Sequence, residues 1–408
     1  MESTKYLLIG GGHASLHAAM AIRERDKEGR VLIVGNEPHP PYDRPPLSKQ
    51  MLTNDEFKTD DPYSKFDNYY PDNNIDLIKG KAVKSIDRAG KRAALEDGSE
   101  IGYEKALIAT GCHLRKLDVP GGDNPDLFYL RYIENSEGIR AALHRTRRAV
   151  VIGSSYMGME AASGCLLRGI ETTIVDGEQM PWSKFASPEL GAFMRKVYED
   201  KGAKFLLGSS VASISKPGEY LRVTTENGQI AEGNIAIACV GHEQNIALAE
   251  AAGLEVEPKK GVVADETLRT SDPSIWVAGD IAYYPDKNVG RKWAAQHFLH
   301  ARATGKRAGA NMAGDVAPYD EVPYFYSDFL DYGMILRGDP KGGKNTTVFG
   351  DMSKGHFVEL YADDDDVLKM GVGITGNFDK LDPWSDKLAE IIRQKPKVAD
   401  LKAAEFGL

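Results

Sequence analysis

Short apolar runs that end at glycines mark the beginning of the chain. Lys5–Ile9 is apolar and stops at the glycine cluster Gly10–Gly12. An alanine-rich stretch with helical spacing follows over Ala14–Arg25, and Arg30–Val34 is a second run with strand character. This order predicts a strand, a glycine loop, a helix and a second strand.

The same order returns about 140 residues later, as an internal repeat. Ala149–Ile152 is apolar and Gly153–Gly158 is rich in small residues. Met159–Arg168 has helical character, and Glu171–Val175 has strand character. The repeat predicts two units that each bind a nucleotide at a strand-to-helix turn.

The rest of the pattern predicts further strands where short apolar runs are bounded by turn residues, and helices where the period is longer. Before residue 318 we expect strands at Lys105–Ala109, Lys204–Leu207, Leu221–Thr225, Asn234–Val240 and Ile275–Val277, and a helix at Trp293–Met312. After a linker at Pro318–Pro323 we expect strands at Thr346–Phe349, His356–Tyr361 and Val367–Val372, and a helix at Trp384–Arg393.

Composition and charge narrow the class of protein. The net charge of −9 argues against nucleic acid or an anionic membrane as the main partner. No apolar run reaches the ~18 residues that a membrane-spanning helix needs. The cysteines, Cys112, Cys165 and Cys239, are far apart, so we expect no disulfide framework, no metal site and a reduced, cytoplasmic location.

The first glycine cluster has the pattern of a dinucleotide fingerprint, Gly10-x-Gly12-x-x-Ser15. The first glycine permits a tight turn, the second lets the backbone approach a pyrophosphate, and the helix N-terminus stabilises negative charge. Ser15 takes the position of a third small residue. After the next strand, Asn36 or Glu37 is the expected partner of a ribose hydroxyl, and the sequence does not decide between them.

The second cluster, Gly153-x-Ser155-x-x-Gly158, has the same context. Ser155 replaces the middle glycine, so we expect its Cβ to crowd the pyrophosphate and weaken binding. Asp176 ends the next strand, where a carboxylate suits a free 2′-hydroxyl and repels a 2′-phosphate. Two fingerprints predict two dinucleotides, and Asp176 favours NADH over NADPH.

The run Tyr42–Lys49 (Tyr-Asp-Arg-Pro-Pro-Leu-Ser-Lys) resembles a loop of the ferredoxin-reductase branch of the pyridine nucleotide–disulfide oxidoreductase superfamily. That branch includes reductases of dioxygenase and cytochrome hydroxylase systems and apoptosis-inducing-factor-like proteins. The resemblance continues through Ala109–Gly111, Gly153–Glu160, Ala278–Asp280 and Pro323–Asp328, and so covers nearly the whole chain.

The resemblance and the repeat together predict an α/β fold with two Rossmann-like dinucleotide-binding domains, for FAD and NAD, and a C-terminal α+β domain. We expect the FAD-binding domain to be discontinuous, over 1–115 and 245–317. The NAD(H)-binding domain is expected over 116–244 and the C-terminal domain over 318–408.

The family implies roles for residues at matching positions. Arg44 would lie by the FAD phosphates and Asp280 by the ribityl chain. Lys49 would lie near the isoalloxazine, within reach of Glu160, and these two are the expected catalytic residues because their coupled titration could tune the flavin potential. The alternative is that Glu160 is an ordinary glutamate at a helix N-terminus.

The two expected cofactor sets follow from these motifs. The FAD set is Gly10, Gly12, His13, Ala14, Asn36, Glu37, Arg44, Lys49, Ala109, Thr110, Gly111, Arg131, Gly279, Asp280, Gln296, His297, Phe298 and Tyr326. The NAD set is Gly153, Ser155, Tyr156, Met157, Gly158, Glu160, Asp176 and Gly241.

Some positions depart from the family pattern. Gln296–Phe298 stands where the family commonly has Glu followed by His, Thr or Trp, Tyr326 replaces a tryptophan, and Gln244 replaces a proline beside His242. The cysteine pair of the disulfide-reductase branch is missing, and we expect Cys112 to be a packed thiol. Electrons would therefore leave directly from the flavin.

These features predict a flavoprotein that takes hydride from NADH and passes electrons to a [2Fe–2S] ferredoxin or a similar one-electron acceptor. The alternatives are an apoptosis-inducing-factor-like protein, whose output is a charge-transfer complex and dimerisation, and an NADH oxidase. We expect a monomer or a homodimer. A basic docking patch would consist of Arg291, Lys292, Arg302, Lys306 and Arg307, unless these are merely solvated charges.

Overall fold

The computed structural model describes residues 2–408, which fold into two compact units. Unit 1 comprises the chain up to Asp43, Pro62–His113 and His242–Pro323. Unit 2 comprises Arg44–Asp61, Leu114–Gly241 and Tyr324–Leu408. Both units are therefore discontinuous in sequence.

Unit 1 is built on a seven-stranded sheet with the order β3-β2-β1-β6-β5-β4, in which β19 also pairs with β6. β1 pairs in parallel with β2 and β6, and β19 pairs in parallel with β6. These are the elements of a dinucleotide-binding fold. The strands are β1 Glu2–Ile9, β2 Val31–Val34, β3 Ile75–Ile78, β4 Val83–Asp87, β5 Arg92–Leu95, β6 Glu100–Ile108 and β19 Ile275–Val277.

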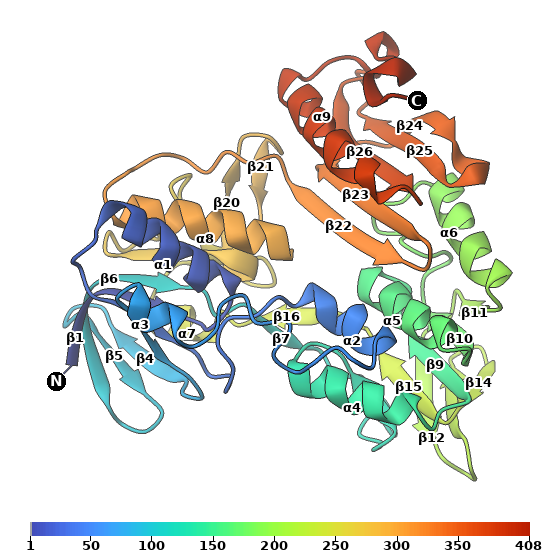
Figure 1. The fold of residues 1–408 in the computed structure, drawn as a ribbon, viewed down its shortest axis with the longest axis horizontal. Helices are drawn as coiled ribbons and strands as arrows, with labels where there is room; N and C mark the ends of the chain where they lie inside the picture. The colour runs from blue at the N-terminus through green and yellow to red at the C-terminus, as the bar shows by residue number, and fades with distance from the viewer. Residues whose placement is uncertain (1) are drawn as a thin grey trace. The chain divides into compact units, whose positions relative to one another are not determined.

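Two helices of unit 1, α1 (His13–Arg25) and α8 (Phe298–Met312), lie side by side (Figure 1). Their backbones touch because glycines face alanines. A Cβ built on Gly305 would lie 2.2 Å from the carbonyl oxygen of Ala14, and one on Gly309 would lie 2.3 Å from that of Ala18. The first and last large segments of unit 1 are thus locked together.

Smaller elements complete unit 1. A four-stranded sheet has the order β17-β18-β20-β21. The expected helix from Trp293 is wrong in its first residues, because Trp293 ends β21 and its Nε1 donates to buried Asp286 at 3.0 Å. The bounds are α3 Tyr69–Asp72, β7 Cys112–Leu114, β16 His242–Gln244, α7 Ala247–Ala251, β17 Val256–Glu257, β18 Gly261–Val263, β20 Ala282–Asp286 and β21 Arg291–Trp293.

Unit 2 contains a second parallel sheet, with the order β11-β10-β9-β15-β8, and a three-stranded sheet, β12-β13-β14. The residues on β9 and β15 are nearly all buried, as expected for central parallel strands. The bounds are β8 Leu127–Tyr129, α4 Ile133–Leu143, β9 Arg148–Ile152, α5 Tyr156–Leu167, β10 Glu171–Asp176, α6 Pro188–Asp200, β11 Lys204–Leu207, β12 Val211–Ser215, β13 Leu221–Thr225, β14 Ile230–Gly233 and β15 Ile235–Ala238.

The end of the chain adds an antiparallel sheet to unit 2, with the order β22-β23-β26-β25-β24. Helix α9 (Leu381–Gln394) packs on β23 and β26 (Figure 1). Gly371 and Gly373 on β26 leave room for the side chains of Leu388 and Trp384. The strands are β22 Tyr324–Phe329, β23 Tyr332–Gly338, β24 Asn345–Asp351, β25 His356–Ala362 and β26 Leu368–Thr375.

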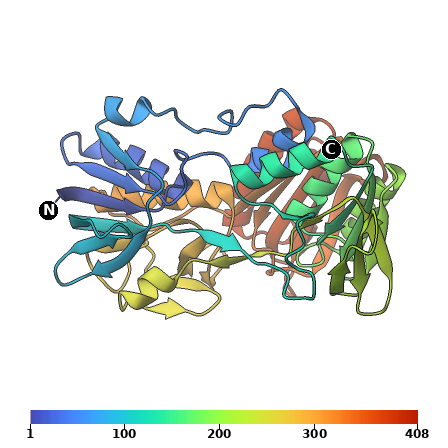
Figure 2. The same ribbon diagram turned by 90° about the horizontal axis from the view of Figure 1, so that it is seen from below.

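One long loop carries the family-like run. It holds the short helix α2 (Gln50–Thr53), and Figure 2 shows the segment between α2 and α3 as an irregular stretch. Within residues 2–408, no helix is both long and apolar enough to cross a bilayer.

The observed elements confirm the expected fold class, with two parallel nucleotide-binding sheets and an α+β part at the C-terminus. Strands at Lys204–Leu207, Leu221–Thr225 and Ile275–Val277 have the predicted bounds. Helices α4 and α6 were not predicted.

Candidate functional site

The first glycine loop joins β1 to α1 in unit 1. Gly10 has φ +122°, and a Cβ there would lie 2.1 Å from the carbonyl oxygen of Ala109. A Cβ on Gly12 would meet nothing within 4 Å. The loop therefore requires glycine at position 10 for its own folding, whereas position 12 opens onto space that a ligand could use.

The first turn of α1 carries polar groups that the protein leaves unsatisfied. Nε2 of His13 lies 2.7 Å from Oδ1 of Asp43, and the Ser64 hydroxyl donates to the same oxygen at 2.8 Å. Among residues 2–408, however, neither Nδ1 of His13 nor Oγ of Ser15 has a hydrogen-bond partner, although both atoms are buried. Because buried polar groups are normally paired, a ligand is the expected partner.

The two predicted partners of the FAD ribose, Asn36 and Glu37, follow β2. Asn36 is exposed and Glu37 is half-buried. Glu37 accepts a hydrogen bond from the hydroxyl of Tyr42 at 2.5 Å. Both residues remain predicted ribose partners.

Two strand ends of unit 1 carry further residues of the expected FAD set. At the end of β6, Thr110 exchanges hydrogen bonds with Asn245: its hydroxyl donates to the Asn245 carbonyl, and the Asn245 amide donates to the Thr110 carbonyl, each at 2.8 Å. At the end of β19, the backbone N–H of Gly279 donates to the hydroxyl of Thr304 at 3.0 Å. The amide of Gln244 donates to the carbonyl of Asp280 at 2.7 Å.

The Gln296–Phe298 segment leads into α8 and makes contacts within unit 1. Nε2 of His242 lies 2.8 Å from Oε1 of Gln296, a residue of the expected FAD set. His297 caps the helix, since its Nδ1 accepts from the N–H of Leu299 at 3.3 Å. The Phe298 ring meets that of His13 edge-on, with centroids 4.5 Å apart.

In unit 2, a buried carboxylate gathers three donors. Glu160, on the second turn of α5, accepts from Nζ of Lys49 at 2.7 Å and from the hydroxyl of Ser327 at 2.6 Å, and the Ser48 hydroxyl donates to its other oxygen. The side chains of Lys49 and Glu160 are only 11% and 7% exposed. Removing one member of such a pair typically costs about 3–5 kcal/mol, because the other is left as an uncompensated buried charge.

Other predicted residues lie around this pair. Nζ of Lys49 sits 5.5 Å from the ring centroid of Tyr326, a cation–π distance. Burial, with Glu160 nearby, raises the pKa of Asp328 despite the opposing charge of Lys49. Arg44 donates to the carbonyl of Arg131 at 2.9 Å.

The second glycine loop joins β9 to α5. Gly153 has φ +107°, and a Cβ there would lie 2.5 Å from the carbonyl oxygen of Cys239. The backbone N–H and hydroxyl of Ser154 donate to Oδ2 of Asp176 at 2.5 and 2.6 Å. Oδ1 of Asp176 accepts from the N–H of Glu178 at 3.0 Å. Asp176 thus holds the glycine loop in place, a role that the sequence did not reveal.

The residues around this loop differ in exposure. Ser155 is exposed, and a Cβ on Gly158 would lie 2.0 Å from the carbonyl oxygen of Gly153. The ring of Tyr156 stacks on Phe185 with centroids 4.8 Å apart. Met157 is half-buried, and Gly241 has φ +100°.

The expected FAD set is divided between the units. Unit 2 carries Arg44, Lys49, Arg131 and Tyr326, together with the whole expected NAD set, and unit 1 carries the others, including Ala14, Ala109 and Gly111. Sequence reasoning missed Ser48 and Ser327 as partners of Glu160 and Asp43 as the partner of His13. Ser48 and Asp43 belong to the family-like run, but the sequence of that run does not indicate which distant residues their side chains contact.

All three cysteines between residues 2 and 408 are buried thiols. Burial raises the pKa of Cys165 and of Cys239 to about 12. Because the thiolate is the reactive form, these two groups are poor redox nucleophiles at neutral pH.

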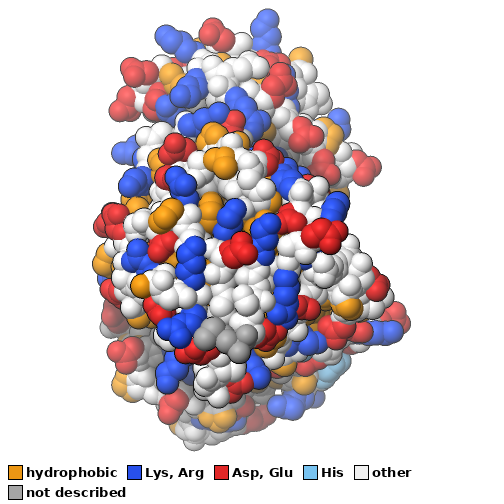
Figure 3. All heavy atoms as spheres, turned by 90° about the vertical axis from the view of Figure 1, so that its left-hand side faces the viewer, with side chains coloured by type: hydrophobic (Ala, Val, Ile, Leu, Met, Phe, Trp, Pro, Cys, Tyr) orange, Lys and Arg blue, Asp and Glu red, His pale blue; other side chains and the backbone are white. Residues whose placement is uncertain are grey.

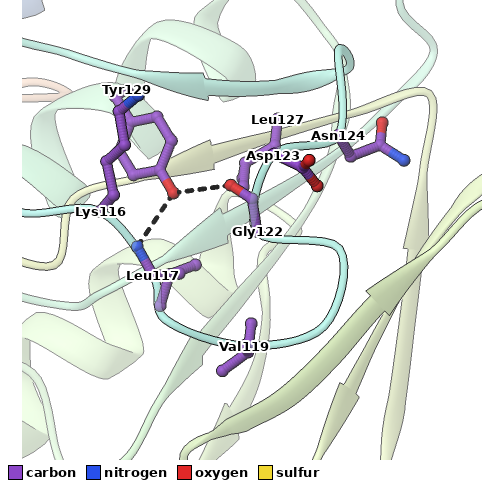
Figure 4. Close-up of a pocket in the computed structure, with 8 residues that line it drawn as sticks. All are labelled: Lys116, Leu117, Val119, Gly122, Asp123, Asn124, Leu127 and Tyr129. Carbon is purple, nitrogen blue, oxygen red and sulfur yellow. Dashed lines mark hydrogen bonds between the residues drawn. The ribbon is translucent and has the colours of Figure 1, made fainter.

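A hollow of about 410 Å³ is lined by residues between Lys116 and Tyr129, none of which belongs to the expected cofactor sets (Figure 4). The Tyr129 hydroxyl accepts from the N–H of Leu117 at 3.0 Å and donates to the carbonyl of Gly122 at 3.1 Å. These bonds fix the loop that lines the hollow.

The expected basic patch is only partly available. Arg302 and Lys306 are exposed, one turn apart on α8. Arg307 instead turns to Asp315, donating to its carbonyl and lying 3.3 Å from its carboxylate. On the face drawn in Figure 3, basic and acidic side chains are interspersed.

The chain matches the family model described as pyridine nucleotide-disulphide oxidoreductase over residues 4–305. It belongs to this family. Among relatives, it is 32% identical to the probable ferredoxin reductase CtmF of Castellaniella defragrans, over 89% of each chain. It is 31% identical to monodehydroascorbate reductase 3 of Arabidopsis thaliana, over 100% of this chain and 97% of the relative.

Solved structures of the family agree with this assignment. The protein superimposes with a TM-score of 0.91, at 26% identity, on the reductase in the covalent putidaredoxin reductase–putidaredoxin complex, covering 100% of this chain and 98% of that one. Together with the relatives, this likeness places the chain in the ferredoxin-reductase branch of the pyridine nucleotide-disulphide oxidoreductases.

Membership of the family implies FAD and NAD(H) as cofactors. The residues present fit them. The first loop offers an open approach at Gly12 and two buried polar atoms in need of partners, and the second offers a preformed glycine turn with a carboxylate behind it.

Proposed function

We propose that this flavoprotein is an NADH-dependent reductase of a [2Fe–2S] ferredoxin. The observation that carries the proposal is the whole-length likeness to a reductase that was crystallised in a covalent complex with putidaredoxin. The buried thiols agree with it, because they offer no dithiol route for electrons. FAD supplies the chemistry, since it accepts electrons as a pair and releases them singly.

The chain's own residues bind and orient the reactants. We assign the diphosphate of FAD to the Gly10–Gly12 loop and to the first turn of α1. NADH is assigned to the Gly153–Gly158 loop. Lys49 and Glu160 form the expected catalytic pair, in which Ser48 and Ser327 hold the carboxylate in place beside the lysine.

Preference for NADH rests on the charge of Asp176. Its carboxylate lies at the end of β10, behind the second glycine loop, where it would repel the 2′-phosphate of NADPH. We expect kcat/KM to favour NADH at least about tenfold, which corresponds to roughly 1.4 kcal/mol.

The acceptor surface proposed for ferredoxin includes Arg302 and Lys306. Replacing both with glutamate should slow ferredoxin reduction at low ionic strength and leave ferricyanide reduction unchanged, because only the protein partner needs electrostatic steering. Arg307→Glu is a poor probe, since it would also break the contact with Asp315. Equal losses with both acceptors would refute the surface.

The proposal is tested by anaerobic stopped-flow. Rapid bleaching of the flavin by NADH, followed by rapid reoxidation on mixing with a [2Fe–2S] ferredoxin, is the expected result. A long-lived charge-transfer band without reoxidation would favour the apoptosis-inducing-factor-like alternative. Rapid consumption of oxygen would favour an NADH oxidase.

A second candidate is the one-electron reduction of a small organic radical. It is favoured by the relative from Arabidopsis thaliana, a monodehydroascorbate reductase that matches this chain from end to end. Turnover with monodehydroascorbate that exceeds turnover with every ferredoxin tested would replace the first candidate by this one.

The expected organisation follows from the same proposal. We retain an FAD-binding domain over 1–115 and 245–317, an NAD(H)-binding domain over 116–244 and a C-terminal domain over 318–408. A monomeric or homodimeric state and a cytoplasmic location also remain predictions, which sedimentation and localisation of the tagged full chain would test.

A further inference from the structure

His13 occupies a position that favours negative charge. It is the first residue of α1, a helix of 13 residues, and it follows the glycine loop directly. The N-terminus of a helix of this length carries partial positive charge and orients unpaired N–H groups outward. The residue is nonetheless only 8% exposed, so its imidazole belongs to the interior of unit 1.

One side of the imidazole is fixed by a carboxylate. Nε2 lies 2.7 Å from Asp43, whose same oxygen also accepts from Ser64. Although burial raises the pKa of Asp43, the hydrogen bonds from His13 and Ser64 leave that pKa below its usual range. Asp43 is therefore an ionised acceptor, and Nε2 must carry a proton.

The other side of the ring has no partner in the protein. Nδ1 is buried, and among the residues that the structure describes it makes no hydrogen bond. Oγ of Ser15, on the same turn and fully buried, is in the same condition. Two orphaned polar atoms beside a glycine loop are the signature of a site that is completed by a ligand.

Titratable and charged side chains from two helices lie around His13 and His17. From α1, His17 stacks on His13 with centroids 5.7 Å apart, and its pKa is lowered to about 4 by burial, His13 and Arg302. From α8, Arg302 and Lys306 act in the same direction on His17. With Asp43 on Nε2, a bound phosphate on Nδ1 would give each ring nitrogen of His13 an anionic acceptor.

We propose that His13 is a protonated donor, held by Asp43, that gives its Nδ1–H to the diphosphate of FAD, so that flavin binding takes up a proton. The inference rests on the proposed assignment of FAD to the first glycine loop. A phosphate oxygen can only accept, so it requires Nδ1–H, and the Asp43 bond already occupies Nε2–H. Both protons are present only in the imidazolium form.

The test is FAD affinity as a function of pH. Apoprotein is titrated with FAD between pH 6 and pH 9 by quenching of flavin fluorescence, for the wild type, His13→Gln, Asp43→Asn and His17→Gln. Calorimetry in two buffers of different ionisation enthalpy counts the protons taken up. Circular dichroism of each apoprotein shows whether the variant is folded.

For the wild type, the Kd should rise with pH by up to about tenfold per pH unit, because binding takes up a proton. His13→Gln should bind about 10- to 100-fold more weakly at pH 6, with a flat pH profile and no proton uptake. His17→Gln is the matched control, because His17 is already neutral, and it should keep the wild-type slope. Asp43→Asn should weaken FAD binding and lessen the proton uptake, because it removes the carboxylate that holds Nε2–H.

A wild-type Kd that does not change with pH would overturn the proposal, and so would a His13→Gln variant that keeps the slope. Absence of FAD binding at every pH would overturn both this inference and the proposed function. A pH-linked flavin without any ferredoxin reduction would overturn the proposed function alone.

Discussion

The two glycine loops of the molecule solve the same folding problem in the same way. Gly10 and Gly153 both have positive φ values. The Cα of Gly10 lies against the carbonyl of Ala109, and the Cα of Gly153 lies against the carbonyl of Cys239. No other residue fits these positions, because both the backbone conformation and the space exclude a Cβ.

The loops differ in how their polar groups are satisfied. In unit 2, Ser154, Asp176 and Glu178 close the second loop with hydrogen bonds of its own. In unit 1, His13 and Ser15 leave buried atoms without a partner among residues 2–408. A loop that is complete by itself suits a cofactor that comes and goes, whereas a loop with orphaned atoms suits one that stays.

The largest effect is expected at the first loop. Gly10→Ala should destabilise unit 1 by about 3 kcal/mol or more, because the new Cβ would overlap the Ala109 carbonyl. Gly12→Ala is the matched control: its Cβ meets no protein atom within 4 Å and its φ is −105°. That variant should unfold within about 1 kcal/mol of the wild type yet bind FAD at least about tenfold more weakly.

Chemical unfolding of both apoproteins, with and without FAD, measures this difference. Equal stability of the two variants would show that the close approach at Gly10 is unimportant.

The C-terminal ends of α1 and α5, the helices that follow the two glycine loops, offer the next test. At the end of α1, Asp26 accepts from Lys5 at 2.8 Å and from the N–H of Gly29 at 2.8 Å, and these bonds lower its pKa. A lowered carboxylate pKa stabilises the fold at neutral pH, and that contribution is lost as the pH falls below about 4. Asp26→Asn should therefore cost about 1–2 kcal/mol at pH 7 and less towards pH 3.

Helix α5 ends at Leu167, and Gly169, with φ +72°, donates its N–H to the carbonyl of Leu166 at 2.9 Å. Gly169→Ala is the control and should cost about 1 kcal/mol at every pH in that range. Thermal unfolding from pH 3 to pH 7 separates the two, and a pH-independent loss for Asp26→Asn would contradict the assignment.

A smaller effect is expected at the second loop. Asp176→Asn replaces an acceptor of three hydrogen bonds by an amide and removes a charge. The KM for NADH should rise about tenfold and the preference over NADPH should fall, as steady-state kinetics with both coenzymes would show. Ser154→Ala removes one hydrogen bond to Asp176 but keeps the charge of Asp176, so this variant should retain the preference for NADH.

The smallest expected effect is a gain. Ser155→Gly restores the fingerprint glycine at an exposed position, and the KM for NADH should fall by about threefold because the backbone can approach the pyrophosphate more closely. An unchanged KM would mean that the Cβ of Ser155 does not crowd the coenzyme. The stability of this variant should not change.

The local sequence pattern was enough to predict the fold class and several strands, because periodicity and glycine turns depend only on residues that are close together in the sequence. The predicted start of α8 was wrong because a hydrogen bond to Asp286 holds Trp293 in a hairpin. Hydrophobic periodicity gives no sign of this contact. Helix α6 was missed although Ser187 caps it and Pro188 opens it, as is usual at helix N-termini.

The site was less predictable because its contacts join distant positions. Lys49 and Glu160 were paired through the family resemblance, but Ser48 and Ser327 reach Glu160 from 112 and 167 residues away. The Asp43–His13 contact likewise depends on where a loop folds back, which spacing does not record.

The glycines of α8 have a consequence for synthesis on the ribosome. Gly305 and Gly309 dock on Ala14 and Ala18 of α1, so the first helix to emerge cannot bury that face until the chain has been made beyond residue 309. Unit 1 also waits for β19 to complete its sheet, whereas the parallel sheet of unit 2 has all its strands once residue 238 has been made. Nascent chains should thus carry an unfinished N-terminal half for most of translation, which exposes it to chaperones.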